Sequence, residues 1–423
     1  MDRKAFVVSS NSTNSNGLQK NPGREKNSFQ ALTGLRFFAA LAVVLYHFAG
    51  PVLRSGPGAL NNVVSSGFVA VSFFYLLSGF VLAYSYTDLT GTLTSTRRSF
   101  WVARFARIYP AYLLAFLLAA PYNVNWTLRV NTFLTALSKL VTGSALVLTL
   151  QQAWTPWTAW YWNFPAWSVS VEAFFYLAFP FLVSLCKSWQ VRATLIGAGI
   201  LWLISLGPPA LFCLTNHAAQ GNGSRFQMAL EFTPLLRLPE FLIGVLLGRC
   251  YMLGLRLSSR VGSALTYTSV VAVLVCLALS PYIPRPLLAT SLLAPLFAAL
   301  IYGLAQGESL LARALSLPWL VCLGEASYAI YILQIPVAYL LRRPPPYNSL
   351  LMLGFYLAIL FVIALLSWHF VELPLRRRIR EFFQPAEQPD RVFSVVVNFP
   401  SRHVPSDDAV SAHHKMEICE MNK

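Results

Sequence analysis

Long apolar segments recur along most of the chain, and they constrain its fold more than any other feature. They begin near Ala31 and continue to Phe370. Hydrophobic residues make up 56% of the sequence and charged residues only 11%, whereas a soluble domain usually carries about 25% charged residues. Many of these segments approach the roughly 20 residues that a helix needs to cross a bilayer. The sequence therefore predicts an all-α, polytopic transmembrane helical bundle.

About ten spans are predicted from the apolar pattern. They cover approximately residues 31–49, 67–86, 100–120, 166–185, 194–214, 238–254, 262–281, 286–304, 318–341 and 350–370. A further apolar segment near 131–152 contains Lys139 and Gly143. Counting it as a span would move every later loop to the opposite side of the membrane. We therefore interpret it as a re-entrant or interfacial segment on the outer side.

The basic residues favour this count. Short loops and the chain ends hold most of the Lys and Arg that give a net charge of +16, a pattern typical of cytoplasmic loops rather than of nucleic acid binding. The loop marked by Arg249 and the C-terminal tail marked by Arg376 fall on the cytoplasmic side if ten spans are counted, while Arg342 and Arg343 fall in a short outer loop as exceptions. We expect a multi-pass protein of the cell membrane, the inner membrane in a bacterium, with both termini cytoplasmic.

The two ends of the chain differ in composition from its centre. Residues 1–27 are rich in Ser and Asn, and residues 379–423 are polar, which predicts disordered cytoplasmic tails around a membrane domain at 28–378. The six cysteines show no paired spacing, so neither a disulfide framework nor a metal site is predicted.

The first predicted span carries Arg36 and, eleven residues later, His47. On a helix the two side chains share nearly one face and lie about 16 Å apart along the axis. Ionisable groups inside a membrane segment are costly and usually mark function. The alternative is structural: Arg36 extends its charge toward the membrane surface, and a backbone carbonyl binds His47.

Two arginines lie one turn apart at the cytoplasmic end of the third span. Arg104 and Arg107 share a helix face, and paired guanidinium groups suit a phosphate-bearing ligand because each can bind phosphate oxygens bidentately. Ordinary anchoring of the span by positive residues is the alternative.

Two later motifs also place charge within apolar segments. Ser168 and Glu172 are four residues apart and share a face. Glu172 could orient a histidine, pair with Arg36 or bind a sugar hydroxyl; alternatively, Ser168 caps the helix and Glu172 belongs to a structural ion pair. Arg237 and Glu240 are three residues apart, which favours a local ion pair.

An aromatic loop precedes the Ser168 motif. Trp, Tyr and Phe occupy six of the twelve positions from Trp154 to Pro165. This composition suits stacking against sugar rings, although an aromatic belt at the membrane surface is the commoner case. Because a histidine can act as a general base near neutral pH, the features together predict group transfer from an inner donor to an outer acceptor. A transporter or flippase for a glycan or acyl intermediate is the alternative.

Six motifs, in this order, resemble the integral-membrane acyltransferase 3 family over about residues 28–378. They are Leu32-Thr-Gly-Leu-Arg36 through His47, Phe73-Phe-Tyr-Leu-Leu-Ser78-Gly79-Phe80, Arg104-Phe-Ala-Arg107, Trp167-Ser-Val-Ser-Val-Glu172, Arg237-Leu-Pro-Glu240 and Val371-Glu372-Leu-Pro374. Gln334 departs from the pattern, because the family often has a histidine there; the Gln334 amide can still form hydrogen bonds.

The resemblance implies transfer of an acyl group, most simply acetyl, from cytoplasmic acyl-CoA to a hydroxyl of an extracytoplasmic carbohydrate, exopolysaccharide or glycolipid. Acyl-CoA is the donor substrate, and no permanently bound cofactor is implied. His47 would be the general base. Arg36, on the same helix face, would be its partner in catalysis or stabilise an oxyanion, and Glu172 would line the acceptor side or tune the site. Arg104 and Arg107 would bind acyl-CoA. The implied substrate-binding residues are Ser78, Trp167, Ser168, Arg237 and Glu240.

Overall fold

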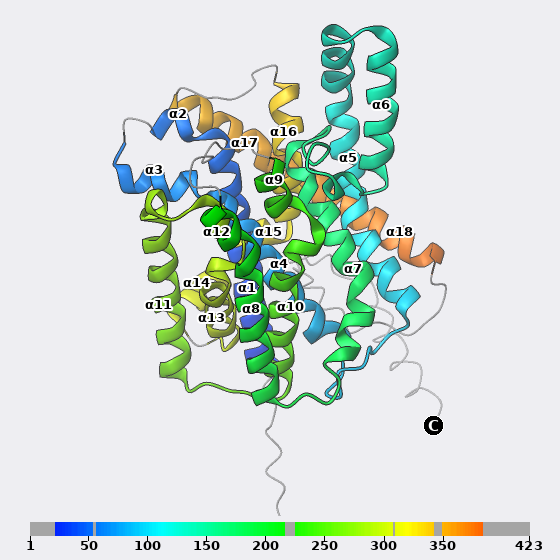
Figure 1. Ribbon diagram of the computed structural model, residues 1–423. Helices are drawn as coiled ribbons and strands as arrows, with labels where there is room; N and C mark the ends of the chain where they lie inside the picture. The colour runs from blue at the N-terminus through cyan, green and yellow to red at the C-terminus, as the bar shows by residue number, and fades with distance from the viewer. Residues whose placement is uncertain (1–21, 54–55, 216–224, 308, 342–348, 384–423) are drawn as a thin grey trace, which may run out of the picture. The chain divides into compact units, whose positions relative to one another are not determined.

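The computed structural model describes residues 22–53, 56–215, 225–307, 309–341 and 349–383, which all belong to one compact unit. These residues are almost entirely helical (Figure 1), so the predicted all-α class is confirmed. Most of both predicted polar tails lies outside the described residues, as do Arg342 and Arg343.

The α-helices are numbered in chain order. They are α1 (Pro22–Phe48), α2 (Gly50–Leu53), α3 (Gly58–Ser65), α4 (Ala70–Tyr86), α5 (Arg97–Val130), α6 (Phe133–Leu148), α7 (Trp167–Leu185), α8 (Val191–Thr215), α9 (Arg225–Phe232), α10 (Pro234–Met252), α11 (Ser259–Ala278), α12 (Arg285–Leu288), α13 (Ala294–Ala305), α14 (Leu310–Leu315), α15 (Pro318–Glu325), α16 (Ser327–Leu340), α17 (Leu350–Ser367) and α18 (Leu373–Phe383). Short turns of other helix types include η1 (Gly67–Val69) and the π-helical turn η6 (Trp368–Glu372).

Among the described residues, seven helical segments are long and apolar enough to cross a membrane. They are built on α1, α4, α5, α7, α8, α11 and α17. The bent pair α15–α16, whose axes differ by 56°, provides an eighth. Large apolar side chains such as Leu203 and Phe355 are more than 60% exposed, as expected where lipid rather than water covers the surface. The protein is therefore a multi-pass membrane protein.

The two remaining predicted spans correspond to helices that do not qualify as spans by length and composition. α10 is 19 residues long but carries Arg237, Glu240 and Arg249. α13 has only 12 residues. Both helices pack against α4. The prediction of about ten spans is thus approximate, because the structure supports seven to eight by this criterion.

Glycines let α4 and α10 approach until their backbones touch. A Cβ atom at Gly79 would lie 2.1 Å from the Phe241 carbonyl oxygen, and one at Gly244 would lie 2.0 Å from that of Leu76. Small residues permit such close packing between membrane helices. This contact fixes α10 against α4 and thereby places Arg237 beside the first turn of α4.

The direction of α1 defines two sides of the bundle. Phe29, near its start, packs against Tyr84 at the end of α4, with ring centroids 4.5 Å apart. Tyr46, near its end, contacts Phe68 just before α4, at 5.4 Å. We call the side where α1 starts the Arg36 side and the side where it ends the His47 side.

Several basic connections meet on the Arg36 side. The Arg249 side chain donates two hydrogen bonds to the Trp189 carbonyl oxygen, at 3.0 and 3.1 Å. Gly91, which follows α4, lies next to both Arg249 and Lys187. The loops after α4, α7 and α10 therefore share one side, as the distribution of basic residues predicts.

The segment at 131–152 folds back without crossing the bundle. α6 lies antiparallel to the second half of α5, and its end is held by two hydrogen bonds: Tyr112 Oη donates to the Val147 carbonyl at 2.8 Å and Tyr109 Oη to that of Leu148 at 3.2 Å. Figure 1 shows the resulting α5–α6 hairpin projecting beyond its neighbours. The prediction that this segment adds no crossing is confirmed.

Candidate active site

A cavity of about 320 Å³ lies on the His47 side. Its walls come from α1, η1, α4, α7, α9, α10, α12 and α16 and from the aromatic loop before α7. The lining includes His47, Trp160, Phe164, Trp167, Glu231, Arg237, Arg285 and Tyr331. We call this cavity the His47 pocket. It contains three of the residues that the sequence nominates, His47, Trp167 and Arg237.

Gln334 fixes which nitrogen of the His47 ring carries the proton. Nδ1 of His47 lies 2.7 Å from Oε1 of Gln334, and Nε2 of Gln334 donates to the Tyr331 carbonyl at 2.7 Å. The amide oxygen therefore faces His47 and accepts the proton of Nδ1. Nε2 of His47, which has no hydrogen-bond partner among the described residues, is left as an acceptor. This is the tautomer that a general base requires.

Four aromatic rings form a continuous wall of the pocket. Phe164 contacts the His47 ring edge-on at 5.3 Å and lies 4.9 Å from Trp160. Phe232 contacts both Trp160, at 5.7 Å, and Trp167, at 4.6 Å. Part of the predicted aromatic loop therefore faces the pocket beside the candidate base.

A charged pair in the same pocket was not predicted from the sequence. Arg285 binds Glu231 through two hydrogen bonds, Nε to Oε1 at 3.1 Å and Nη2 to Oε2 at 3.3 Å. Burial acts to lower the pKa of Arg285, but the Glu231 carboxylate outweighs it and the pKa lies above its ordinary value. The two residues are 54 positions apart, so no helical spacing in the sequence signals the pair.

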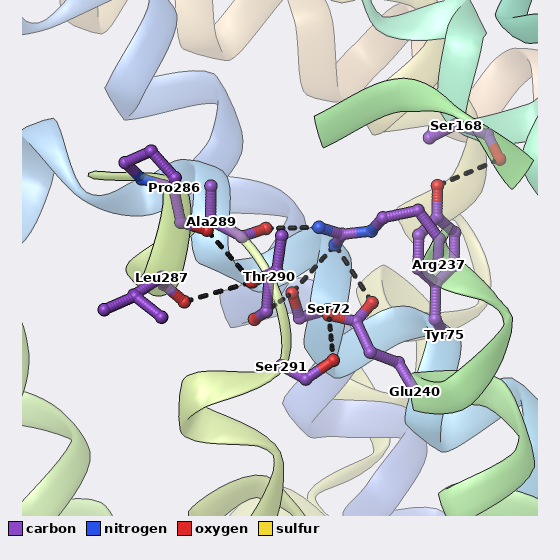
Figure 2. Close-up of polar contacts among 10 residues, drawn as sticks. All are labelled: Ser72, Tyr75, Ser168, Arg237, Glu240, Pro286, Leu287, Ala289, Thr290 and Ser291. Atoms are coloured by element: carbon purple, nitrogen blue, oxygen red, sulfur yellow. Dashed lines mark hydrogen bonds and ion pairs between the residues drawn. The ribbon is translucent and has the colours of Figure 1, made fainter. Parts of the chain in front are cut away.

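Arg237 belongs to a buried polar cluster in the pocket wall (Figure 2). Its guanidinium lies 3.0 Å from Glu240 Oε2, donates to Ser72 Oγ at 2.9 Å and donates to the Ala289 carbonyl. The side chains of Arg237 and Glu240 are 2% and 1% exposed. The local ion pair that the spacing favours is confirmed, and it also joins α4 to the connection after α12.

Ser168 supports the pocket from outside its lining. Its hydroxyl donates to the Pro165 carbonyl at 3.0 Å and lies 2.7 Å from Tyr331 Oη. No side chain in the described part of the chain forms a capping hydrogen bond at the start of α7, so the capping role considered for Ser168 is wrong. The residue instead joins α7 to the pocket-lining helix α16.

A second polar cluster lies toward the Arg36 side, and we call it the Arg36 cluster. Arg36 is half-buried and within electrostatic range of Arg107, Glu325 and Glu172. Arg107 forms an ion pair of 3.1 Å with Glu372, which lies in the π-helical turn η6; such turns are frequent at functional sites. The cluster joins α1, α5, α15 and η6.

Arg104 contributes to the Arg36 cluster without a carboxylate partner. Nη2 of Arg104 donates to Tyr86 Oη at 2.7 Å, and the guanidinium lies over the Tyr86 ring. Its Nε is buried and has no hydrogen-bond partner among the described residues. The positive charge of Arg104 is therefore only partly compensated by neighbouring protein groups.

Glu172 and Ser78 lie between the two sites. Ser78 Oγ donates to Glu172 Oε1 at 3.3 Å, and Tyr176 Oη donates to the same oxygen. Glu172 is within electrostatic range of Arg36 and also of Tyr331 in the His47 pocket. Because Gln334 binds His47, Glu172 does not orient the histidine.

Comparisons with known proteins are consistent along the membrane region. The family model described as an acyltransferase domain matches residues 29–372. The acyltransferase MdmB of Streptomyces mycarofaciens is 34% identical over 327 residues, which cover 73% of this chain and 78% of MdmB. No solved structure matches the chain significantly.

Two more distant relatives are longer than this chain. YrhL of Bacillus subtilis, provisionally named as a peptidoglycan O-acetyltransferase, is 28% identical over 82% of this chain and 54% of its own length. The O-acetyltransferase OatA of Staphylococcus aureus is 24% identical over 82% of this chain and 57% of its own length. The chain thus spans little more than half of either relative. The match over most of the membrane region shows that the chain is an acyltransferase and belongs to the integral-membrane acyltransferase 3 family.

Proposed function

We propose that the chain transfers an acyl group, most simply acetyl, from cytoplasmic acyl-CoA to a hydroxyl of an extracytoplasmic carbohydrate. The observation that carries this proposal is the His47–Gln334 hydrogen bond of 2.7 Å. It leaves the second ring nitrogen of His47 available in a pocket with an aromatic wall. Such a wall suits a sugar ring, and the names of YrhL and OatA refer to O-acetyl transfer.

The basic loops support an orientation for the reaction. Lys187, in the connection after α7, and Arg249, in the last turn of α10, lie on the Arg36 side. Cytoplasmic loops and helix ends are enriched in such residues. We therefore assign the Arg36 side, with both termini, to the cytoplasm. The His47 pocket then lies on the extracytoplasmic side, where an exported acceptor is available.

The Arg36 cluster suits the donor. Arg36 forms no ion pair within 4 Å among the described residues, and Arg104 has only tyrosine partners there. Their charges are available to the phosphates of acyl-CoA, with Arg107 beside them. Arg36 lies about 16 Å from His47 along α1, so we assign it to the donor rather than to an oxyanion at His47. A linear pantetheine arm laid along α1 would carry the thioester toward His47.

The proposed chemistry uses His47 twice. Nε2 removes the proton from the acceptor hydroxyl while its oxygen attacks the thioester carbonyl, forming a C–O bond and a tetrahedral intermediate. Collapse of this intermediate breaks the C–S bond. The departing CoA sulfur takes the proton from Nε2, which returns His47 to its starting state and completes the transfer.

Purified protein tests this proposal directly. With labelled acetyl-CoA and a set of methyl glycosides in detergent, wild-type protein is expected to form acetylated glycoside. His47→Gln should lower kcat by about 10²- to 10⁴-fold, the range that general bases contribute, while acyl-CoA still binds. Wild-type turnover by the His47→Gln protein would refute the role of His47. A transporter or flippase would form no acetylated glycoside in this assay, because it only moves its substrate between compartments and a detergent solution has none.

A further inference from the structure

Both arginines that line the His47 pocket within the described residues have a carboxylate partner. Arg237 pairs with Glu240, and Arg285 pairs with Glu231. The remaining lining residues are apolar, aromatic or neutral polar, apart from the His47 ring, which acts as an acceptor. Within the described residues, the pocket therefore contains charged groups but offers no excess of either sign.

Further contacts hold the Glu231–Arg285 pair, in which the Glu231 side chain is 9% exposed and that of Arg285 is 34% exposed. Gln227 Nε2 donates to Glu231 Oε1 at 3.0 Å. The Arg285 guanidinium lies over the Phe68 ring, 4.4 Å from its centroid, and Nη2 also reaches Tyr46 Oη at 3.4 Å. Contacts on several sides make it costly for either partner to turn toward a charged ligand, because the other would be left unpaired.

The pair nevertheless keeps hydrogen-bonding capacity for a neutral ligand. A guanidinium has five N–H donors and a carboxylate about four acceptor sites. The bonds to Glu231 and Tyr46 use Nε and Nη2 of Arg285, which leaves Nη1 without a hydrogen-bond partner among the described residues. Adjacent donors and acceptors of this kind match sugar hydroxyls, each of which both donates and accepts.

We infer that the His47 pocket selects an uncharged, hydroxylated ring, and that Glu231 and Arg285 bind hydroxyls next to the one that is acylated. This inference rests on the proposed function and names the class of its acceptor: one sugar unit without a carboxylate, phosphate or ammonium group. A charged substituent loses water on entering the pocket and meets no unpaired countercharge. The volume of about 320 Å³ is at the small end of ligand pockets, consistent with one ring.

The test compares three matched acceptors with the purified protein and acetyl-CoA: methyl glucoside, its uronate and its amino-sugar analogue. Wild-type protein should acetylate hydroxyls of the neutral glycoside with a kcat/KM at least about tenfold higher than for either charged one. Glu231→Gln leaves Arg285 unpaired and should shift the preference toward the uronate. Arg285→Gln leaves Glu231 unpaired and should shift it toward the amino sugar.

The double variant Glu231→Gln/Arg285→Gln controls for folding, because it removes both charges together. It should again prefer the neutral glycoside, with a higher KM than wild type. The exposed Arg129 in the α5–α6 hairpin provides a matched control, since Arg129→Gln should leave the preference unchanged. Wild-type preference for a charged glycoside, or equal preferences in all variants, overturns the inference while leaving acyl transfer intact. Transfer to none of the three contradicts the proposed carbohydrate acceptor itself.

Discussion

Gln334 Oε1 accepts the Nδ1 proton of His47 across 2.7 Å, although 287 positions separate the two residues. The family that this chain resembles often has a histidine at the position of Gln334. An amide at that position can accept the Nδ1 proton of His47 and so fix its tautomer, without carrying charge. The departure from the family pattern is therefore compatible with His47 acting as a base.

Removing the Gln334 amide should impair the chemical step. Gln334→Leu keeps a similar volume but removes the acceptor for Nδ1–H, so the His47 ring can adopt the wrong tautomer. We expect kcat to fall by at least about tenfold, a part of the 10²- to 10⁴-fold that a general base contributes. Steady-state kinetics with purified protein, together with acyl-CoA binding, would measure this.

Tyr356→Phe provides the matched control. Tyr356 Oη donates to the backbone carbonyl oxygen of Gln334 at 2.6 Å, so this hydrogen bond does not involve the Gln334 side chain. Its loss should affect stability more than kcat. An equal fall in kcat for both variants would mean that general loosening of α16, rather than the tautomer of His47, limits the rate.

Arg104→Gln should weaken binding of acyl-CoA. The side chain has a buried Nε without a partner among the described residues, and removing one charge-assisted hydrogen bond to a phosphate costs about 1.5–3 kcal/mol. We expect the Kd for CoA, measured by calorimetry in detergent, to rise by at least about tenfold, the lower end of that free-energy range. An unchanged Kd would mean that Arg104 only anchors the span.

Arg107 needs a different design, because it also pairs with Glu372 at 3.1 Å. Arg107→Gln alone leaves a buried carboxylate unpaired and should lower stability. The double variant Arg107→Gln/Glu372→Gln restores charge balance and should recover the thermal midpoint but not the affinity for CoA. Recovery of both would assign Arg107 a purely structural role.

Local patterns in the sequence predict the helices and the pairs within a helix. The three-residue spacing of Arg237 and Glu240 predicts their ion pair, and the eleven-residue spacing of Arg36 and His47 correctly places both on α1. The sequence predicts the number of spans only approximately, because the charges on α10 are stabilised by tertiary partners such as Ser72 that no local pattern reveals.

Contacts between distant segments are what the sequence does not predict. The Glu231–Arg285 pair and the His47–Gln334 bond join elements whose proximity depends on the whole bundle. Glu172 is a further example. Its four-residue spacing places it on the same helix face as Ser168, but it is not among the residues that line the His47 pocket. The side chain lies between that pocket and the Arg36 cluster, at a depth that only the packing of α7 determines.

Breaking the Arg237–Glu240 pair should strongly destabilise the protein. Both side chains are almost fully buried, so Arg237→Met or Glu240→Leu leaves an uncompensated charged group at a cost of about 3–5 kcal/mol. The double variant Arg237→Met/Glu240→Leu should be closer to wild type in thermal unfolding. A double variant as unstable as the sum of the single variants would mean that the two residues act independently.

Cysteine labelling should place the α5–α6 hairpin outside the cell. Leu134 on α6 is 78% exposed and Leu89, in the loop after α4, is 66% exposed, so cysteines at these positions are reachable. Gly143 is a poor site, since a Cβ there would lie 2.4 Å from the Tyr161 ring. In a background without native cysteines, an impermeant maleimide should label Leu134→Cys in intact cells and Leu89→Cys only after lysis. Labelling of Leu89→Cys in intact cells would invert the orientation and place the Arg36 cluster away from cytoplasmic acyl-CoA.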